Sequence, residues 1–373
     1  MKVLYLFRSI AVWGGIERIL VDKMNFLVDR YNVDVYLLTT DQGVHKIPYE
    51  LSADVHYEDL NICFYKQYCH HGLRRLLTAK KMLRRYELLL ADRLNKIKPD
   101  LIICTTSDHI DSIVKIKGTV PLIVESHSIC ARTIEDGKYW LQRKLYRKNY
   151  LHALSKVDVI VALTEGDAQE WGKYHSHVCV IPNFVHQHDD YFSHQESQIV
   201  IFVGRFDYQK RVQDAIRIWR LVGERHSDWA LEIYGEGEML EDIKNFASTS
   251  GNVITHQPIK NIFQVYCDSA LLMMTSLYEP FGLVLPEAMS CGLPVVAFDC
   301  PYGPADIITD GVDGFLIKNR DIQVFADRVC QLIEDEELRR RMGQNGIASS
   351  QRYRADVIMP KWINLFKKVL SSQ

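Results

Sequence analysis

The sequence predicts an α/β protein made of two doubly wound parallel-sheet domains. Short apolar runs alternate with longer stretches of helical periodicity along the chain, which is typical of parallel sheets covered by helices. A polar segment interrupts this alternation near the middle, and 373 residues exceed what a single core usually supports. The expected strands lie at 2–7, 33–39, 100–105, 121–126, 157–163, 177–182, 198–203, 229–235, 252–256, 270–275, 293–299 and 312–317.

Composition and cysteine usage restrict the class of protein. An apolar fraction of 47% and a charged fraction of 25% are those of an ordinary globular protein, so extended disorder is not expected. The nine cysteines include no CxxC pair, which favours reduced thiols and a cytoplasmic location. The opening MKVLYLF is too short for a signal peptide, and no run of about 18 apolar residues follows, so we expect no membrane span.

The first domain is expected over residues 1–184, with two candidate ligand positions. Gly14 and Gly15 follow the first strand and should form a tight turn that opens a helix at Ile16. His127 follows the strand at 121–126, at the edge where parallel sheets bind ligands. A sterically required turn and a structural histidine are the alternatives. The missing GxGxxG spacing disfavours a dinucleotide-dependent oxidoreductase.

Positive charge is concentrated in the first domain although the formal net charge is −2. Residues 66–98 contain ten Lys and Arg against two acids, and 135–151 adds a second basic stretch with aromatic neighbours. Such helices suit an anionic membrane surface, so we expect peripheral contact with the cytoplasmic face of the inner membrane; a solvated face is the alternative. No nucleic-acid motif is present, and nucleic acid is not expected as a partner. The basic residues concerned are Arg74, Arg75, Lys80, Lys81, Arg84, Arg85, Arg143, Lys144, Arg147 and Lys148, with Tyr139, Trp140, Tyr146 and Tyr150 among the second group.

A polar linker is expected at 185–197, because this segment loses apolar periodicity. It contains His186, His188 and His194, and His177 lies nearby, but their spacing matches no structural metal site. We therefore interpret the segment as a hinge and expect no bound metal. The second domain then covers 198–354, and periodicity predicts helices at 321–334, 336–350 and 355–370.

The first strand of the second domain leads into GRFDYQKR, in which Gly204 lets the backbone turn. Arg205 and Lys210 follow before a helix, and two such cations can converge on a diphosphate. Cations and helix-end amides of this kind stabilise negative charge that develops on a diphosphate.

The stretch at 275–292, TSLYEPFGLVLPEAMSCG, places Glu279 and Glu287 eight residues apart. Glu279 ends an apolar strand, and Pro286 suits a helix that begins close to it. The amides of Phe281, Gly282 and Leu283 should point out of the helix N-terminus and form an anion site. Two solvated acids on an amphipathic helix are the alternative.

The form EPFGLVLPEAMSCGLPVVA, together with G-R-x4-K-R, resembles the retaining glycosyltransferases of family 4, also called group 1. The resemblance covers nearly the whole chain and is strongest at 199–317. It implies the GT-B architecture, in which two Rossmann-like domains face a central cleft. It also implies that the final helix, 355–373, packs back on the first domain.

The resemblance further implies roles for the residues singled out above. Glu279 would hold sugar hydroxyls, Glu287 the ribose hydroxyls, and Arg205 with Lys210 the diphosphate. The expected catalytic residues are then His127, Arg205, Lys210 and Glu279. The expected donor-binding residues are Gly14, Gly15, Gly204, Arg205, Lys210, Glu279, Phe281, Gly282, Leu283 and Glu287.

These features predict a retaining glycosyltransferase that moves a hexose or N-acetylhexosamine from a UDP-sugar to a hydroxyl of a glycan or lipid-linked acceptor, in cell-surface polysaccharide assembly. No DxD triplet is present, so neither a metal nor another cofactor is expected. The alternatives are a nucleotide-sugar epimerase or hydrolase of the same fold, and a non-catalytic nucleotide-sugar-binding subunit.

Overall fold

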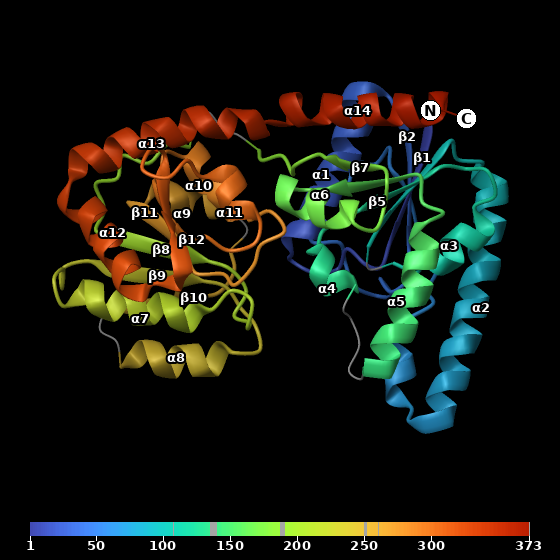
Figure 1. Cartoon of the computed structure of the whole chain (residues 1–373), viewed down its shortest axis with the longest axis horizontal. Helices are drawn as coiled ribbons and strands as arrows, with labels where there is room; N and C mark the ends of the chain where they lie inside the picture. Colours follow the sequence, from blue (N-terminus) through green and yellow to red (C-terminus); the bar gives the residue numbers. More distant parts are fainter. Residues whose placement is uncertain (107, 135–139, 187–190, 250–251, 260, 373) are drawn as a thin grey trace. The chain divides into compact units, whose positions relative to one another are not determined.

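The computed structural model describes residues 1–106, 108–134, 140–186, 191–249, 252–259 and 261–372 (Figure 1). The chain divides into two compact units. The first combines Met1–Ile181 with Met359–Gln373, and the second is Pro182–Ile358. Each unit contains one parallel sheet with helices around it, which confirms the predicted fold class.

The sheet of the first unit has seven parallel strands in the order β3-β2-β1-β4-β5-β6-β7. The central strands β4 and β5 are buried along their whole length, because helices cover both faces. The bounds are β1 (Lys2–Phe7), β2 (Asp34–Thr39), β3 (His56–Asp59), β4 (Leu101–Thr105), β5 (Leu122–Glu125), β6 (Val159–Ala162) and β7 (Val178–Val180).

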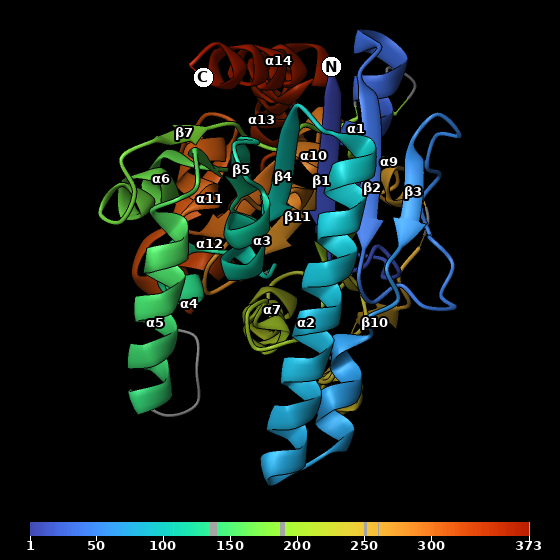
Figure 2. The ribbon, with the colours of Figure 1, turned by 90° about the vertical axis from the view of Figure 1, so that its right-hand side faces the viewer.

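The helices of the first unit cover the two faces of this sheet (Figure 2). They are α1 (Gly15–Tyr31), η1 (Phe64–Cys69), α2 (Gly72–Ile97), α3 (Ile110–Ile116), α4 (Cys130–Ile134), α5 (Trp140–Leu154) and α6 (Glu165–Gly172). Residues of α2, α3, α5 and α6 share one apolar core with β1, β4, β5 and β6. On the opposite face, Leu20 and Met24 of α1 lie against Tyr5, Leu37 and Ile103.

The C-terminal helix α14 (Ala355–Ser371) belongs to the first unit from Met359 onward. Its Trp362 is almost completely buried and lies over the ammonium of Lys23 on α1, 3.9 Å from the ring centroid. A segment at the end of the sequence therefore completes the unit formed by its beginning.

The sheet of the second unit has six parallel strands in the order β10-β9-β8-β11-β12-β13. Val200 and Ile201 of β8 lie opposite Leu271 and Leu272 of β11, so these two strands are neighbours although about 70 residues separate them along the chain. The bounds are β8 (Ile199–Val203), β9 (Ala230–Tyr234), β10 (Val253–His256), β11 (Leu271–Met274), β12 (Val295–Phe298) and β13 (Gly314–Ile317).

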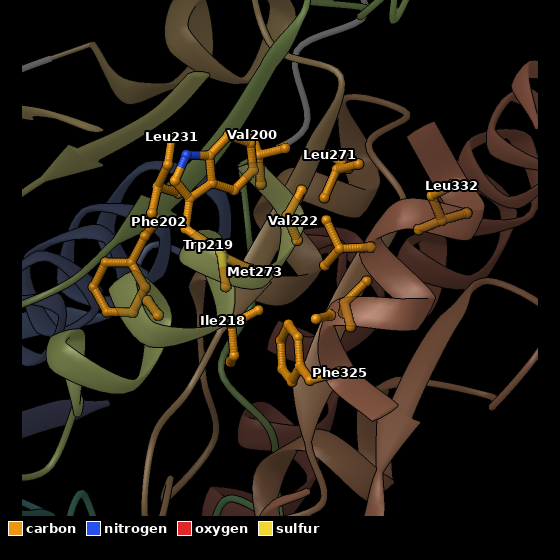
Figure 3. Packing of buried hydrophobic residues seen from close by; sticks show 14 of the residues in the cluster. Val200, Phe202, Ile218, Trp219, Val222, Leu231, Leu271, Met273, Phe325 and Leu332 are labelled. Atoms are coloured by element: carbon orange, nitrogen blue, oxygen red, sulfur yellow. The ribbon is translucent and has the colours of Figure 1, made fainter. Parts of the chain in front are cut away.

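The helices of the second unit pack around this sheet, and α7, α8 and α12 bury apolar residues against one face. Trp219 of α7 lies among Val200, Phe202 and Leu231 of the strands in the close view of this core (Figure 3). The bounds are α7 (Val212–Gly223), α8 (Leu240–Ser248), α9 (Ile262–Cys267), α10 (Val284–Ser290), α11 (Gly303–Ile307), η2 (Lys318–Arg320), α12 (Ile322–Glu334), α13 (Glu336–Ser350) and η3 (Gln351–Tyr353).

Two boundaries differ from those expected from the sequence. The change of unit lies between Ile181 and Pro182, and the segment expected as a linker belongs to the second unit. Its amide at Ser193 donates to Cys291 O, and the Gln195 amide nitrogen reaches Gly292 O at 2.5 Å. The described residues near the end of this polar segment are therefore hydrogen-bonded to the second unit.

Strand β3 was not predicted, because HYED is polar and its side chains are exposed or half-buried at the sheet edge. In the described parts of the chain, no helix is both long and apolar enough to cross a membrane. All nine cysteines are free thiols.

Candidate active site

The candidate site of the second unit is formed by loops at the carboxyl ends of β8 and β11. The strand order changes direction between these neighbours, since β9 and β10 lie on one side and β12 and β13 on the other. Parallel sheets bind ligands at such a switch point. The loop after β8 carries Gly204, Arg205 and Lys210, and the loop after β11 carries Glu279, so the fold brings the two sequence motifs together.

An ion pair joins these two loops. The Lys210 ammonium donates to Glu279 Oε1 at 2.5 Å, and the Ser276 hydroxyl donates to the same oxygen at 2.5 Å. The side chains of Lys210 and Glu279 are only 15% and 4% exposed. An ammonium has three donors, so Lys210 can hold Glu279 and still donate to an anionic ligand.

Backbone hydrogen bonds hold the two loops in register. Thr275 donates its hydroxyl to the carbonyls of Lys210 and Arg211, at 3.0 Å in each case. The Leu277 amide donates to Gln209 O, and the Gln209 side chain donates to Tyr278 O. The position of Lys210 is therefore determined by the loop that carries Glu279.

The loop at 301–303, which follows β12, fixes the backbone of Glu279. The Glu279 amide donates to Pro301 O at 2.6 Å, and Glu279 O accepts from the amides of Tyr302 and Gly303. Gly303 is required at this contact, since a Cβ there would lie 1.8 Å from Phe281 O. The glycine-rich segment after β12 thus supports the acidic residue after β11.

Arg205 lies at the surface of the same loop, and its side chain is 69% exposed. Its guanidinium is 3.2 Å from Asp207 Oδ2 and makes a long contact with Gln209. Gly204 packs against Lys210, since a Cβ at Gly204 would lie 3.4 Å from the Lys210 stem. Arg205 is therefore free to swing onto a ligand, whereas Lys210 is held in place.

The turn between Glu279 and α10 has the backbone form expected of an anion site. Gly282 has φ +91°, a conformation that glycine adopts without strain. Among the described residues, no protein acceptor pairs with the amides of Phe281, Gly282 and Leu283. The Phe281 side chain is buried against Tyr353, so only its backbone can reach a ligand.

Glu287 is the fourth residue of α10, which begins at Val284. Pro286 is the third helical residue, where its missing N–H removes no intrahelical bond. The Glu287 carboxylate is buried and accepts from the Tyr266 hydroxyl at 3.1 Å. Tyr266 on α9 was not singled out from the sequence, because its partner lies 21 residues away along the chain.

Arg320, which bonds to the loop after β11, was also not identified from the sequence. Arg320 donates to Ser276 O and Thr275 O at 2.7 and 2.9 Å, and to Asp214 Oδ2 at 2.9 Å. Burial opposes ionisation of Asp214, but hydrogen bonds from Arg211 and Arg320 outweigh it and lower its pKa. No motif marked Arg320, which follows β13 and reaches the site only through the tertiary fold.

In the first unit, His127 lies in a buried ionic cluster just after β5. His127 Nε2 is 3.0 Å from Glu125 Oε2, which also accepts from the Lys23 ammonium at 2.5 Å. Burial disfavours the Glu125 carboxylate, but Lys23 and His127 overcome this and lower its pKa to about 2. The Glu125 carboxylate therefore orients the histidine that the sequence singled out.

The loop after β1 differs in detail from the expected tight turn. Gly14 has an extended backbone and serves as the N-cap of α1, which begins at Gly15. Gly14 O accepts from the Tyr49 hydroxyl at 2.9 Å. Gly14 thus precedes the helix and Gly15 is its first residue, one position before the expected start at Ile16, without a left-handed turn at Gly14.

The first unit has a pocket of its own at the carboxyl ends of β1, β2 and β4. Its volume is ≈ 140 Å³, and the strand order changes direction here, between β1 and β4. Burial raises the pKa of Asp108 to about 7, although the Thr105 amide and hydroxyl donate to its carboxylate. The lining combines aromatic and polar side chains, including Arg8, Asp41, Phe64, Tyr68, Asp108 and His109.

Some residues named from the sequence cannot be placed. His188 and Tyr139 lie outside the described residues. The side chains of Trp140, Arg143 and Lys144 are likewise outside the described part, although the backbone of α5 is included from Trp140. Arg147 and Lys148 on the same helix are exposed.

Comparison with known families supports the class that this fold suggests. Residues 13–188 match the family model described as Glycosyltransferase Family 4, and residues 186–349 match the model described as Glycosyl transferases group 1. The amylovoran biosynthesis glycosyltransferase AmsD of Erwinia amylovora is 29% identical over 97% of this chain and 98% of its own length. The matches to three other curated relatives cover 24%, 46% and 61% of those relatives' own lengths.

Solved structures share the fold across the whole chain. TarM of S. aureus, crystallised with Fondaparinux, alpha-GlcNAc-glycerol and UDP, matches 98% of this chain and 99% of its own at 18% identity and a TM-score of 0.78. Sucrose-phosphate synthase of Thermosynechococcus elongatus matches 100% of both chains at 16% identity and a TM-score of 0.80.

Two parallel-sheet Rossmann-like units, as in these solved structures, define a fold of GT-B type. The family matches together span residues 13–349. The chain therefore matches the models of glycosyltransferase family 4 and of group 1 in succession, and the enzyme class predicted from the sequence, a glycosyltransferase, is confirmed.

Proposed function

We propose that this enzyme transfers a hexose or N-acetylhexosamine from a UDP-sugar to a hydroxyl of a glycan or lipid-linked saccharide, with retention of the anomeric configuration. The observation that carries the proposal is the Lys210–Glu279 pair at the switch point of the second sheet. A cation for the diphosphate and a carboxylate for sugar hydroxyls are the two groups that a nucleotide-sugar donor requires.

Donor binding follows from the chemistry of these loops. Lys210 and the exposed side chain of Arg205 would neutralise the charge of the diphosphate, together with the backbone amides at 281–283. Glu279 would accept hydrogen bonds from sugar hydroxyls, and Glu287 would accept them from the ribose. UDP is the proposed nucleotide because the TarM structure of the same fold was crystallised with UDP.

The reaction would proceed without a metal. As the sugar–phosphate bond breaks, negative charge grows on the diphosphate, and preorganised Lys210 and backbone amides stabilise it. The leaving phosphate would take the proton from the acceptor hydroxyl on the same face of the sugar, which gives retention. His127, held by Glu125, would donate or accept one hydrogen bond at the donor sugar.

The acceptor would bind to the first unit. Its pocket beside β1, β2 and β4 has the mixture of aromatic faces and polar groups that suits a saccharide. AmsD is named for amylovoran biosynthesis, and this relative supports a role in cell-surface polysaccharide assembly. A lipid-linked acceptor would place the enzyme at the cytoplasmic face of the membrane.

The test is product analysis with UDP-glucose, UDP-galactose and UDP-N-acetylglucosamine, after a thermal-shift screen that also includes ADP- and GDP-sugars. A bound donor at 100 times its Kd stabilises the folded state by about 2.7 kcal/mol, which raises Tm. We expect one UDP-sugar to raise Tm and to give an α-linked product in the presence of EDTA. Sugar release or epimerisation that does not depend on acceptor would instead support a hydrolase or epimerase, and binding without turnover would support a non-catalytic subunit.

A further inference from the structure

Three leucines near the beginning of α2 are exposed to solvent although their side chains are apolar. Leu73, Leu76 and Leu77 are 72%, 67% and 60% exposed, all within the first two turns of the helix. Single exposed leucines are common, but three within five residues form an apolar patch. Tyr65 and Tyr68 of η1 are also exposed, and Arg75 lies over the Tyr68 ring at 4.4 Å.

Positive charge surrounds this patch. Residues 60–86 contain seven Lys and Arg and no acid. The first turn of α2 also carries no acidic residue, so the positive end of the helix dipole adds to the charge. The exposed cations are Lys66, Arg74, Arg75, Lys80, Lys81, Arg84 and Arg85.

The first turns of α2 do not reach the core of the unit, against which Met82 and Leu83 are the first residues of this helix to pack. Its buried residues begin only at Tyr86 and continue with Leu90 and Leu94. In both views of the structure, the N-terminal end of α2 runs past the strands of the first sheet with η1 alongside it (Figures 1 and 2). Fourteen helical residues, 72–85, precede Tyr86, and we name them the α2 tip.

We propose that the α2 tip docks on an anionic lipid surface by inserting Leu73, Leu76 and Leu77 among the acyl chains. Long basic side chains beside the leucines can keep their apolar stems in the membrane and their charges at the headgroups. Amphipathic segments of this kind bury their apolar side about 5–10 Å deep. Charge complementarity selects lipid phosphates as the partner, because the whole surface from 60 to 86 lacks acids.

Docking would place the acceptor where the enzyme can use it. Phe64, Gln67 and Tyr68 of η1 line the pocket of the first unit, and the same short helix lies beside the α2 tip. A saccharide linked to a membrane lipid could then reach this pocket while its lipid stays in the bilayer. This use of the surface rests on the proposed function, whereas lipid binding itself is measured without donor or acceptor.

The experiment is co-sedimentation of the full chain with vesicles of 30% phosphatidylglycerol in phosphatidylcholine, compared with pure phosphatidylcholine. We expect binding to the anionic vesicles only, weakened by 0.5 M NaCl. The triple variant Leu73→Ser/Leu76→Ser/Leu77→Ser should lower the partition coefficient at least about tenfold, because each buried leucine contributes to the apolar transfer. The variant Lys80→Gln/Lys81→Gln/Arg84→Gln/Arg85→Gln should lower it more than about a hundredfold, since each charge near such a surface contributes roughly fivefold.

Leu88 provides the matched control. It lies on the same helix and is 66% exposed, but it is eleven residues beyond Leu77, or about 16 Å further along the axis. Leu88→Ser should therefore bind vesicles like the wild type. Thermal melts of all variants should match the wild type, because the replaced side chains are exposed.

Three results in the vesicle experiment would overturn the proposal. They are a wild-type chain that does not bind anionic vesicles, a triple leucine variant that binds like the wild type, and an equal loss in Leu88→Ser. A dimer that the leucine variant abolishes, without vesicle binding, would assign the patch to a second copy and overturn it too. A chain that binds vesicles but transfers no sugar would refute the proposed function alone, and transfer to a soluble acceptor without vesicle binding would refute the docking surface alone.

Discussion

Lys210 combines a structural contact with the catalytic role proposed for it. Its ion pair with Glu279 holds the ammonium at the position where negative charge would develop in the proposed reaction. A preorganised charge costs no reorganisation during the reaction, and removing one such donor typically lowers the rate about 10²–10³-fold.

We therefore expect Lys210→Ala to reduce kcat far more than it reduces donor affinity. Steady-state kinetics with the identified donor, combined with calorimetric measurement of UDP binding, separates the two effects. Arg205→Ala is the comparison, because this exposed residue is not held in place and should contribute more to binding than to turnover. Equal losses of kcat in both variants would contradict the preorganisation argument.

Glu287 should act through binding instead. Its carboxylate is buried and oriented by the Tyr266 hydroxyl, which suits recognition of a vicinal diol. Glu287→Ala should weaken binding of UDP-sugar and of UDP alike by about tenfold, the worth of roughly one charged hydrogen bond. Tyr266→Phe, which keeps the carboxylate but removes its partner, should lose less affinity. Unchanged UDP affinity in Glu287→Ala would refute the ribose contact.

The Glu125 cluster predicts a pH dependence of stability. The pKa of folded Glu125 is about 2, below its ordinary 4.5, so its stabilising contribution is complete above pH 4.5 and is lost as the pH falls toward 2. A shift of this size corresponds to something on the order of 3 kcal/mol. Urea unfolding between pH 7 and pH 2 should show the difference between the wild type and Glu125→Gln shrinking over this acidic range.

A double variant controls for the buried lysine. Glu125→Gln alone leaves the Lys23 ammonium buried without a counter-charge, which typically costs about 3–5 kcal/mol. Lys23→Met/Glu125→Gln removes both charges and should recover part of that loss. A pH-independent difference between the wild type and Glu125→Gln would show that the carboxylate does not titrate as proposed.

At the scale of elements, the site depends on loops that support one another. The loop at 301–303 binds the backbone of Glu279, and the loop after β8 is bonded to the one after β11. Adjacent parallel strands bring their carboxyl ends to the same edge, so these loops meet although they are distant along the chain. A change in a supporting loop should therefore affect Glu279 without touching a ligand.

Gly303→Ala tests this dependence. The added Cβ would lie 1.8 Å from Phe281 O, so the 301–303 loop must shift and Glu279 with it. We expect a loss of at least about 2 kcal/mol in unfolding free energy together with a weaker donor affinity. Gly223→Ala is the matched control, because a Cβ at the end of α7 meets nothing within 4 Å and alanine favours helix. Equal stability of the two variants would contradict the proposed contact.

At the scale of the whole molecule, the first unit is assembled from both ends of the chain. Residues from Met359 onward belong to it, and Trp362 and Phe366 of α14 are buried there. Removing α14 would take away the apolar side chains that cover Lys23 of α1, and this part of the first unit would be exposed to water. The C-terminal helix is thus part of the fold of the first unit rather than an appendage.

A fragment of residues 1–181 should therefore fail to fold by itself, whereas 182–358 should fold independently. Circular dichroism and thermal melts of both fragments provide the measurement, and a synthetic peptide of 355–373 should restore a cooperative transition to the first fragment. In the full chain, Trp362→Ala should cost about 3–5 kcal/mol. A cooperative melt of 1–181 alone would contradict this account.

Local patterns determined the fold class and most elements of this protein. Buried parallel strands are continuous apolar runs, and helices are longer periodic ones, so both are readable without tertiary information. The edge strand β3 was missed, because an exposed strand loses the apolar signal. The motifs G-R-x4-K-R and E-x7-E each follow a strand and singled out Lys210 and Glu279 as candidate site residues, but not their ion pair.

Only the tertiary structure decided which side chains meet. Arg320, Tyr266 and Gly303 approach the candidate site from segments that carry no motif, because strand order rather than sequence order makes their loops neighbours. The same holds for Lys23 and Glu125, which lie 102 residues apart yet form a buried ion pair beside His127. Sequence alone determines which segments become strands and helices, since that depends on short-range periodicity. The contacts of a site instead depend on the order of the strands in the sheet and on which distant segments of the chain pack against its faces.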